Sequence, residues 1–280
     1  MFSWFKSKSP AISTMDVSKV ERFNDPSCIY TFFTDLTGIH FDQKKSIVTP
    51  KLIRFAKEYE CYSFEELFEK LRSDQRCKEE LINLLTVNET YFYREMGQIE
   101  FAAKTIQNDS SYRRILCAPG ASGEEPYSIV IYLSEQGCDL SKIEIVSIDI
   151  NTEVITKARC GTYPNRSLYR LGDEIKERYF IPEGDGYRLV DSIRQKVTFH
   201  PCNLFDEAFS RLGKFDIIFS RNMLIYFDQE TITRAIEQLK KVASSDKTLF
   251  FFGHADIVSK IPTLNEHYRD GIKYYTMRTI

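Results

Sequence analysis

The chain has 280 residues, of which 42% are hydrophobic and 28% are charged, and this composition excludes a disordered or fibrous protein. Its length predicts about two domains. Lysine and arginine number 38 against 40 aspartate and glutamate residues, and the balance holds on both sides of residue 110, so we expect no nucleic-acid partner. The longest stretch without a charged residue is nine residues, whereas a membrane-spanning helix needs about 18 apolar ones, so we expect no membrane insertion.

The first ten residues contain no hydrophobic signal segment, and the seven cysteines are scattered without a C-x-x-C pair. Both features predict a cytoplasmic protein with reduced thiols. His200 and Cys202 are two potential metal ligands on one segment, without a second pair to complete a site. Because structural metal sites usually take four ligands, we expect no metal.

Residues 1–25 are largely polar, and we expect them to form a mobile tail. A helical domain is predicted over residues 26–87, because apolar residues there recur at spacings of three and four. Thr49 is placed to cap a helix that Pro50 begins, and Ser63 opens a capping box before the next helix. The apolar stripe of the first of these helices is Leu52, Phe55, Ala56 and Tyr59.

Three cations lie at three-residue spacing on the same helix, roughly opposite its apolar stripe: Lys51, Arg54 and Lys57. In most proteins such a row is an ordinary solvated helix face. It also fits a surface that docks an acidic partner, and the residues alone leave both interpretations open.

From residue 106 to 280, strand patterns alternate with helix patterns, which predicts an α/β domain with a Rossmann-like, mostly parallel sheet. Residues 88–105 are then a linker segment between the two domains. Predicted strands cover 114–118, 142–150, 197–202, 215–220, 248–252 and 273–280, and predicted helices cover 124–135, 152–159 and 229–242. The alternation lapses over about 163–195, where a glycine-rich turn between two short apolar runs predicts a small inserted antiparallel β-subdomain.

In such a sheet, ligands bind beyond the carboxyl ends of the strands. The loop after the first predicted strand, residues 119–123, has only two glycines, and Glu124 and Glu125 follow at the start of the next helix. Two carboxylates there repel a pyrophosphate, so a nicotinamide dinucleotide fits poorly. They attract a cationic ligand, although the helix dipole alone also favours acidic residues in a first turn.

Polar residues also end two other predicted strands. Asp149 ends the second strand, where a carboxylate can bind the ribose hydroxyls of a nucleoside or cap the next helix. Arg221 and Asn222 interrupt the apolar run at the end of the fourth strand. An amide and a backbone carbonyl at this edge suit an amino-acid-like group or the rim of an adenine.

Five segments together resemble the chemotaxis receptor methyltransferase family (CheR), in order and in spacing. They are NETYFYR at 88–94, ASGEEPYSI at 121–129, IDINTEVITKAR at 148–159, FDIIFSRNMLIYFD at 215–228 and FFGHAD at 251–256. The resemblance runs from about residue 28 to the C-terminus. It implies that the protein uses S-adenosylmethionine to methylate glutamate side chains of a chemoreceptor and releases S-adenosylhomocysteine.

The resemblance also implies site residues, position by position. The cofactor-binding positions are Asn88, Thr90, Arg94, Glu125, Asp149, Asn203, Leu204, Asn222 and Met223. Arg94 and Tyr226 are placed close to the transferred methyl group, as catalytic residues. The acidic cytoplasmic domain of a chemoreceptor is then a partner for Lys51, Arg54 and Lys57, and we expect the enzyme to be a monomer.

The sequence departs from the family pattern in two places. Ala121 stands where the family usually has a hydroxyl residue, and GHAD at 253–256 replaces GHSE, which leaves the hydrogen bonding around Asp256 open. Two other functions use the same residues: a non-catalytic S-adenosylmethionine-binding signalling module, and a methyltransferase of this fold that acts on another substrate. The presence of both Arg94 and Tyr226 favours an enzyme.

Overall fold

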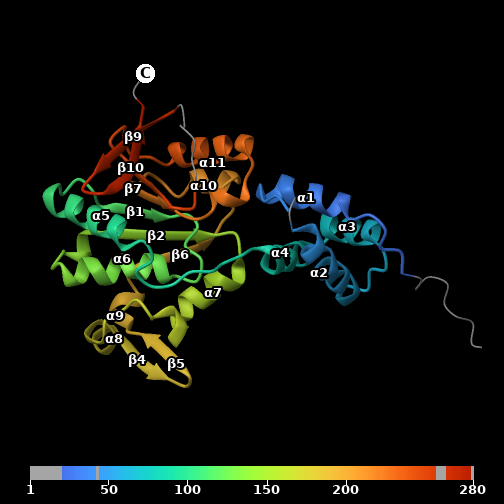
Figure 1. Ribbon diagram of the computed structural model, residues 1–280, viewed down its shortest axis with the longest axis horizontal. Coiled ribbons are helices and arrows are strands. Elements are labelled where there is room, and N and C mark those ends of the chain that lie inside the picture. Colours follow the sequence, from blue (N-terminus) through green and yellow to red (C-terminus); the bar gives the residue numbers. More distant parts are fainter. Residues whose placement is uncertain (1–20, 42–43, 257–262, 279–280) are drawn as a thin grey trace, which may run out of the picture.

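The computed structural model describes residues 21–41, 44–256 and 263–278, so most of the predicted tail lies outside the described residues. Four helices come first: α1 (Ser27–Thr37), α2 (Lys45–Glu58), α3 (Phe64–Ser73) and α4 (Gln75–Leu85). They enclose a hydrophobic core of their own and lie beside the larger α/β part of the chain (Figure 1). The helical N-terminal region predicted from the apolar spacing is therefore confirmed.

The predicted start of the basic helix at Thr49 and Pro50 is wrong, because α2 already begins at Lys45 and Pro50 lies inside it. The Thr49 hydroxyl donates a hydrogen bond to the Lys45 carbonyl at 2.8 Å, as a side chain within a helix does. Pro50 lies in the second turn, where it removes one backbone hydrogen bond without ending the helix. The Ser63 cap is present, since Ser63 Oγ accepts the N–H of Glu66 at 3.1 Å, but the Glu66 carboxylate accepts the N–H of Tyr62 and not that of Ser63, so the reciprocal bond of the predicted capping box is shifted by one residue.

A seven-stranded sheet forms the centre of the α/β part, in the order β6-β2-β1-β7-β8-β10-β9. The first five strands are parallel and β10 is antiparallel to both of its neighbours, β8 and β9, which confirms the predicted Rossmann-like fold class. In sheet order the strands are Val197–Pro201, Glu144–Asp149, Arg114–Cys117, Ile217–Ser220, Leu249–Phe252, Ile272–Met277 and Leu264–Arg269. The last of these, β9, was not predicted, because it lies at the sheet edge and buries little of its surface.

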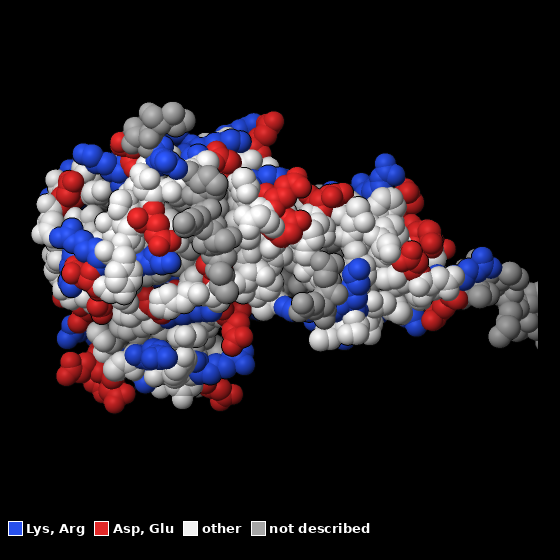
Figure 2. Space-filling view, turned by 45° about the horizontal axis from the view of Figure 1, so that its top comes forward, with Lys and Arg blue, Asp and Glu red and all other residues white. Residues whose placement is uncertain are grey.

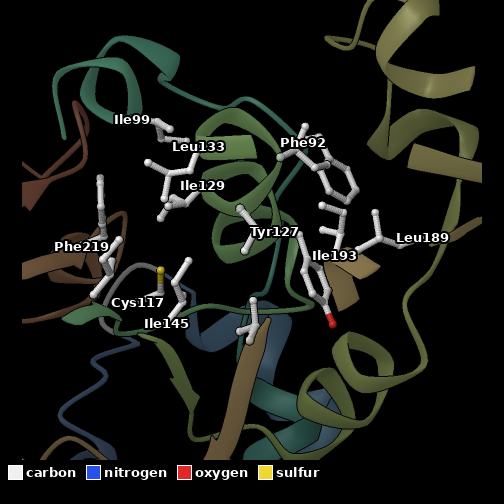
Figure 3. Close-up of a cluster of buried hydrophobic side chains, with 14 of the residues drawn as sticks. Phe92, Ile99, Cys117, Tyr127, Ile129, Leu133, Ile145, Leu189, Ile193 and Phe219 are labelled. Carbon is white, nitrogen blue, oxygen red and sulfur yellow. The ribbon is translucent and has the colours of Figure 1, made fainter. Parts of the chain in front are cut away.

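Helices cover both faces of the sheet. On one face lie α5 (Met96–Asn108), α6 (Glu124–Glu135) and α7 (Thr152–Cys160), and on the other lie α10 (Glu207–Ser210) and α11 (Gln229–Lys241). A hydrophobic core lies on each face of the sheet, and neighbouring residues of a strand belong to different cores. Cys117 packs with α6 in the core of Figure 3, and Leu116 packs with α11 in the other core. Helix α5 occupies much of the segment predicted as a linker.

A second, three-stranded antiparallel sheet forms the predicted β-subdomain, which projects from the larger sheet in Figure 1. Its strands are β3 (Thr162–Pro164), β5 (Gly186–Leu189) and β4 (Phe180–Glu183), and the helices α8 (Asp173–Tyr179) and α9 (Asp191–Arg194) flank them. Leu189 and Ile193 join the core on the α6 side of the sheet, close to Phe92 and Tyr127 (Figure 3). The subdomain is thus anchored to the sheet and to the segment that connects the two parts.

Candidate cofactor site at the carboxyl ends of the strands

A cavity of about 220 Å³ lies at the carboxyl ends of the parallel strands, between the sheet and the N-terminal helices. The predicted residues that line it are Lys51, Asn88, Asp149, Asn203, Leu204, Asn222, Met223 and Tyr226. The other members of the predicted set lie outside its wall: Arg54, Lys57, Thr90, Arg94 and Glu125. An apolar cavity with a few fixed polar groups is typical of a site for a small organic ligand.

Residues 39–41, which follow α1, line this cavity on the side of the N-terminal helices. The Asn203 side-chain amide donates to the Leu36 carbonyl at 2.7 Å, and the His40 N–H donates to the Tyr226 carbonyl at 3.0 Å. Gly38 has a φ of +77°, and a Cβ there would lie 2.6 Å from a methyl group of α11, so the close approach requires glycine. Both parts of the chain are therefore needed to build the site.

Asp149 ends β2 and is buried in the wall of the cavity. One carboxylate oxygen accepts the Ala121 N–H at 3.0 Å, and the other accepts the Asn151 N–H at 2.9 Å. Burial raises the pKa of Asp149 to about 6, although these hydrogen bonds oppose the rise. Asn151, not Asp149, caps α7, so the helix cap is excluded as the role of Asp149.

Glu125 and Arg221 form a buried ion pair next to the cavity, with Glu125 Oε2 3.0 Å from Arg221 Nε. Burial raises the pKa of Glu125, and the charge of Arg221 opposes this rise. Arg221 also donates to the Arg94 carbonyl at 2.6 Å, which ties the end of β7 to the connecting segment. Glu124 turns away from this pair, because its carboxylate accepts hydrogen bonds from two serine hydroxyls.

The buried polar atoms at this edge without a hydrogen-bond partner among the described residues include Glu125 Oε1, Arg221 Nη1 and Asn222 Nδ2. One acceptor and two donors match the ammonium and carboxylate groups of a methionine moiety. Asp149 offers a carboxylate to the two ribose hydroxyls, and Leu204 belongs to the apolar wall that suits an adenine ring. The residues present therefore fit S-adenosylmethionine, whose positive charge the carboxylates favour.

Tyr226 lies at the mouth of the cavity with two cations near it. Lys44 Nζ is 5.3 Å from the centre of the Tyr226 ring. Burial raises the pKa of the Tyr226 hydroxyl, and the charge of Arg94 opposes this rise. The Arg94 guanidinium is held by a hydrogen bond of 3.0 Å to the Glu89 carbonyl. The sequence did not single out Lys44 for this position; its only signal is that it directly precedes a basic helix.

Asp256 holds the loop that follows β7. Its carboxylate accepts the N–H groups of Asn222 at 2.6 Å, Gly253 at 2.9 Å and Ile225 at 3.2 Å. Asn222 has a φ of +58°, a left-handed conformation that these bonds stabilise. With GHAD in place of the usual GHSE, Asp256 therefore still accepts three backbone hydrogen bonds at this loop. The sequence signals this role of Asp256 only by placing an acidic residue shortly after a buried strand.

The predicted docking residues lie on α2 in different settings. Lys51 lines the cavity, whereas Arg54 pairs with Glu58 at 3.6 Å and Lys57 pairs with Glu21 at 2.8 Å. Of the three, only Lys51 has no ion-pair partner within the described part of the chain. Figure 2 shows basic and acidic side chains interspersed over the face in view, as the net charge of −2 implies.

All seven cysteines lie within the described residues and are free thiols. In residues 21–41, 44–256 and 263–278, no group of three or more histidine, cysteine, aspartate or glutamate side chains is placed to hold a metal ion. A search of the same residues finds no helix that is both long and apolar enough to cross a membrane.

Comparison with known proteins identifies the family. Residues 88–271 match the family model described as CheR methyltransferase, SAM binding domain, and residues 29–86 match CheR methyltransferase, all-alpha domain. The chain is 37% identical over 228 residues to a chemotaxis protein methyltransferase of Campylobacter jejuni, covering 80% of this chain and 85% of that protein. It is 38% identical to chemotaxis protein methyltransferase 2 of Vibrio cholerae over 91% of each chain, and 32% identical to the Escherichia coli protein over 79% of each. The chain therefore belongs to the CheR family of S-adenosylmethionine-dependent chemotaxis protein methyltransferases.

Proposed function

We propose that this enzyme transfers a methyl group from S-adenosylmethionine to glutamate carboxylates of a chemoreceptor, with glutamate methyl ester and S-adenosylhomocysteine as products. The observation that carries the proposal is a cavity with the Asp149 carboxylate in its wall and two cations, Lys44 and Arg94, around Tyr226 at its mouth. The cavity suits a cationic methyl donor. The mouth suits an anionic methyl acceptor, as a glutamate side chain is.

The acceptor needs no general base, because glutamate has a pKa of about 4.3 and is ionised at pH 7. The cofactor supplies a methyl group on a positively charged sulfur, which a carboxylate oxygen attacks in line. Arg94 orients the carboxylate through charge-assisted hydrogen bonds. Tyr226 also stays protonated, because burial raises its pKa, so its hydroxyl donates a further bond.

The receptor is proposed to dock on the side of α2 that borders the cavity. Lys44 and Lys51 line the cavity, and Ile47 between them is 63% exposed. Positions three and four residues apart share one helix face, so two cations flank an apolar side chain there. Arg54 and Lys57 continue the basic row, but their ion pairs weaken their attraction for an acidic helix.

Each part of the chain has a role in this proposal. Residues 26–87 dock the receptor, residues 88–105 carry Arg94, and residues 106–280 hold the cofactor and the inserted β-subdomain. Methyl transfer turns a carboxylate into a neutral ester, so the local negative charge of the receptor falls and its helices repack. We propose that the enzyme acts in this way as a cytoplasmic monomer without a metal ion.

Incubation with tritiated S-adenosylmethionine and a receptor cytoplasmic fragment from the source cell tests the proposal. We expect base-labile label on the fragment with the wild-type enzyme and loss of most of it with Arg94→Ala. Cofactor binding without label on any protein would favour the signalling module. Label on a different protein of the cell would favour a methyltransferase with another substrate.

A further inference from the structure

Two arginines and two tyrosines, from the connecting segment and the β-subdomain, form a chain of side-chain contacts that begins at Arg94. The Arg94 guanidinium lies 5.7 Å from the ring centre of Tyr91, the rings of Tyr91 and Tyr169 are 5.0 Å apart, and the Arg170 guanidinium lies 5.4 Å from the ring of Tyr169. Tyr169 is 56% exposed. We call these four residues the arginine–tyrosine ladder.

The ladder joins the connecting segment to the β-subdomain, and the backbone between its members is held firmly. The Phe92 N–H donates to the Ser167 carbonyl at 2.9 Å. The Phe92 ring is fully buried, with ring centres of Tyr163 and Phe180 at 4.9 and 5.1 Å, and Figure 3 shows it in the core with the subdomain residues. A buried anchor of this kind fixes Tyr91 relative to Tyr169 before any partner binds.

Neither arginine of the ladder has an acidic partner within the described residues. Arg94 donates a hydrogen bond to a backbone carbonyl and lies 5.7 Å from the centre of the Tyr91 ring, and Arg170 contacts the side chain of Tyr169. Guanidinium groups held over aromatic rings keep their edges available for carboxylates. Exposed tyrosine and arginine side chains are also the types most enriched in protein interfaces.

We propose that the ladder is a second docking surface for the receptor helix that presents the reacting glutamate, and that it selects which glutamate enters the cavity. This inference rests on the proposed function. Arg94 binds the reacting carboxylate, and Arg170 binds another carboxylate of the same receptor helix. An α-helix advances about 5.4 Å per turn. The three steps of the ladder are 5.7, 5.0 and 5.4 Å, so the two arginines are separated by at most about three helical turns, and carboxylates within that span of one helix can reach both. The two rings contact the apolar side chains between them.

Charge complementarity singles out an acidic helix as the occupant. Both free ends of the ladder are cationic, and one of them is the residue proposed to orient the methyl acceptor. The ladder therefore extends the surface on which the methyl acceptor is proposed to lie. It does so along the connecting segment that carries Arg94. A receptor helix that contacted only α2 would be held on one side of its reacting glutamate, whereas contacts with the ladder would hold it on the other side as well.

The test compares Arg170→Glu and Tyr169→Ala with Lys196→Glu, a charge reversal at an exposed lysine outside the ladder. Initial rates are measured on the receptor fragment at saturating S-adenosylmethionine, and mass spectrometry gives the share of methyl ester at each glutamate. Calorimetry gives cofactor affinity, and circular dichroism confirms folding. We expect Arg170→Glu to raise KM for the receptor about tenfold and to redistribute the methyl esters, with kcat and cofactor affinity within twofold. Tyr169→Ala should raise KM less, and Lys196→Glu should leave it unchanged.

Several results would overturn the inference. One is an Arg170→Glu enzyme with the same KM and the same ester distribution as Lys196→Glu. Another is a parallel loss of kcat and cofactor affinity, which would mean that the ladder only supports the fold. A change of oligomeric state in Arg170→Glu, seen by sedimentation, would mean that a second copy of the chain occupies the ladder. If the wild-type enzyme methylates no receptor fragment, the proposed function fails first and the ladder loses its partner.

Discussion

Replacing Arg221 with methionine gives a large and specific prediction, because the structure buries this arginine against a carboxylate. Its side chain is 2% exposed and that of Glu125 is 10% exposed, with 3.0 Å between Arg221 Nε and Glu125 Oε2. Removing one member of such a pair costs about 3–5 kcal/mol, because the remaining charge stays buried. Loss of the hydrogen bond to the Arg94 carbonyl acts in the same direction. We expect the free energy of unfolding at pH 7 to fall by about 3–5 kcal/mol.

The pH dependence of this loss has a definite sign. Burial already raises the pKa of Glu125, and without Arg221 the pKa rises further. The cost therefore applies above the raised pKa, where the carboxylate is charged, and shrinks as the pH falls and the group takes up a proton. Urea unfolding followed by circular dichroism at pH 7 and pH 5 measures both values. Arg76→Met is the matched control, since Arg76 pairs with Glu80 at the surface and its loss should change little.

A double variant separates the ion pair from general packing. Glu125→Gln removes the nearer of the two carboxylates that pair with Arg221, the other being Glu95 at 3.7 Å, so Arg221→Met should cost less in that background, by about 2 kcal/mol. The reasoning would be refuted if Arg221→Met changed the unfolding free energy by less than about 1 kcal/mol, or if the two substitutions were additive.

Three further predictions concern the site itself. Cofactor affinity should fall as the pH drops through about 6, where Asp149 takes up a proton, and calorimetry with Asp149→Asn should show a flatter profile in this range. Asp256→Ala leaves three N–H groups without an acceptor, so we expect a loss of about 2 kcal/mol in stability and a lower kcat, measured by unfolding and methylation assays. Lys51→Glu should raise KM for the receptor several-fold more than Arg54→Glu, because Lys51 lines the cavity without an ion-pair partner among the described residues, whereas Arg54 pairs with Glu58; equal effects would contradict this.

The parts of the site that follow from local sequence signals were predictable. Glu125 starts a helix directly after a glycine loop, and Asp149 ends a buried strand, so their approximate positions follow from one segment each. The carboxyl ends of parallel strands meet at one edge, which brings such residues together without further information. The spacing of apolar residues likewise predicted most strands of the sheet. The exposed strand β9 was not predicted, because too few of its residues are buried to show a repeating pattern.

The contacts between distant segments were not predictable. Pairing of Arg221 with Glu125 depends on the alignment of β7 beside β1, and a charged residue in an apolar run gives no partner. Closure of the cavity by His40 and Lys44 depends on how the N-terminal helices sit on the sheet. The start of α2 was predicted wrongly because Thr49 and Pro50 together form a typical helix-start signal. In the structure, tertiary packing stabilises a helix that begins earlier and includes both residues.

The central claim is that the cations around Tyr226 direct methyl transfer to a glutamate carboxylate. The most direct measurement is mass spectrometry of a receptor cytoplasmic fragment after reaction with the wild-type enzyme and with Arg94→Lys and Tyr226→Phe. The account predicts methyl esters on glutamate residues with the wild type, a strong loss of kcat with Arg94→Lys, whose ammonium lacks the planar fork, and a smaller loss with Tyr226→Phe. Methylation of any other kind of side chain, or full activity in both variants, would contradict it.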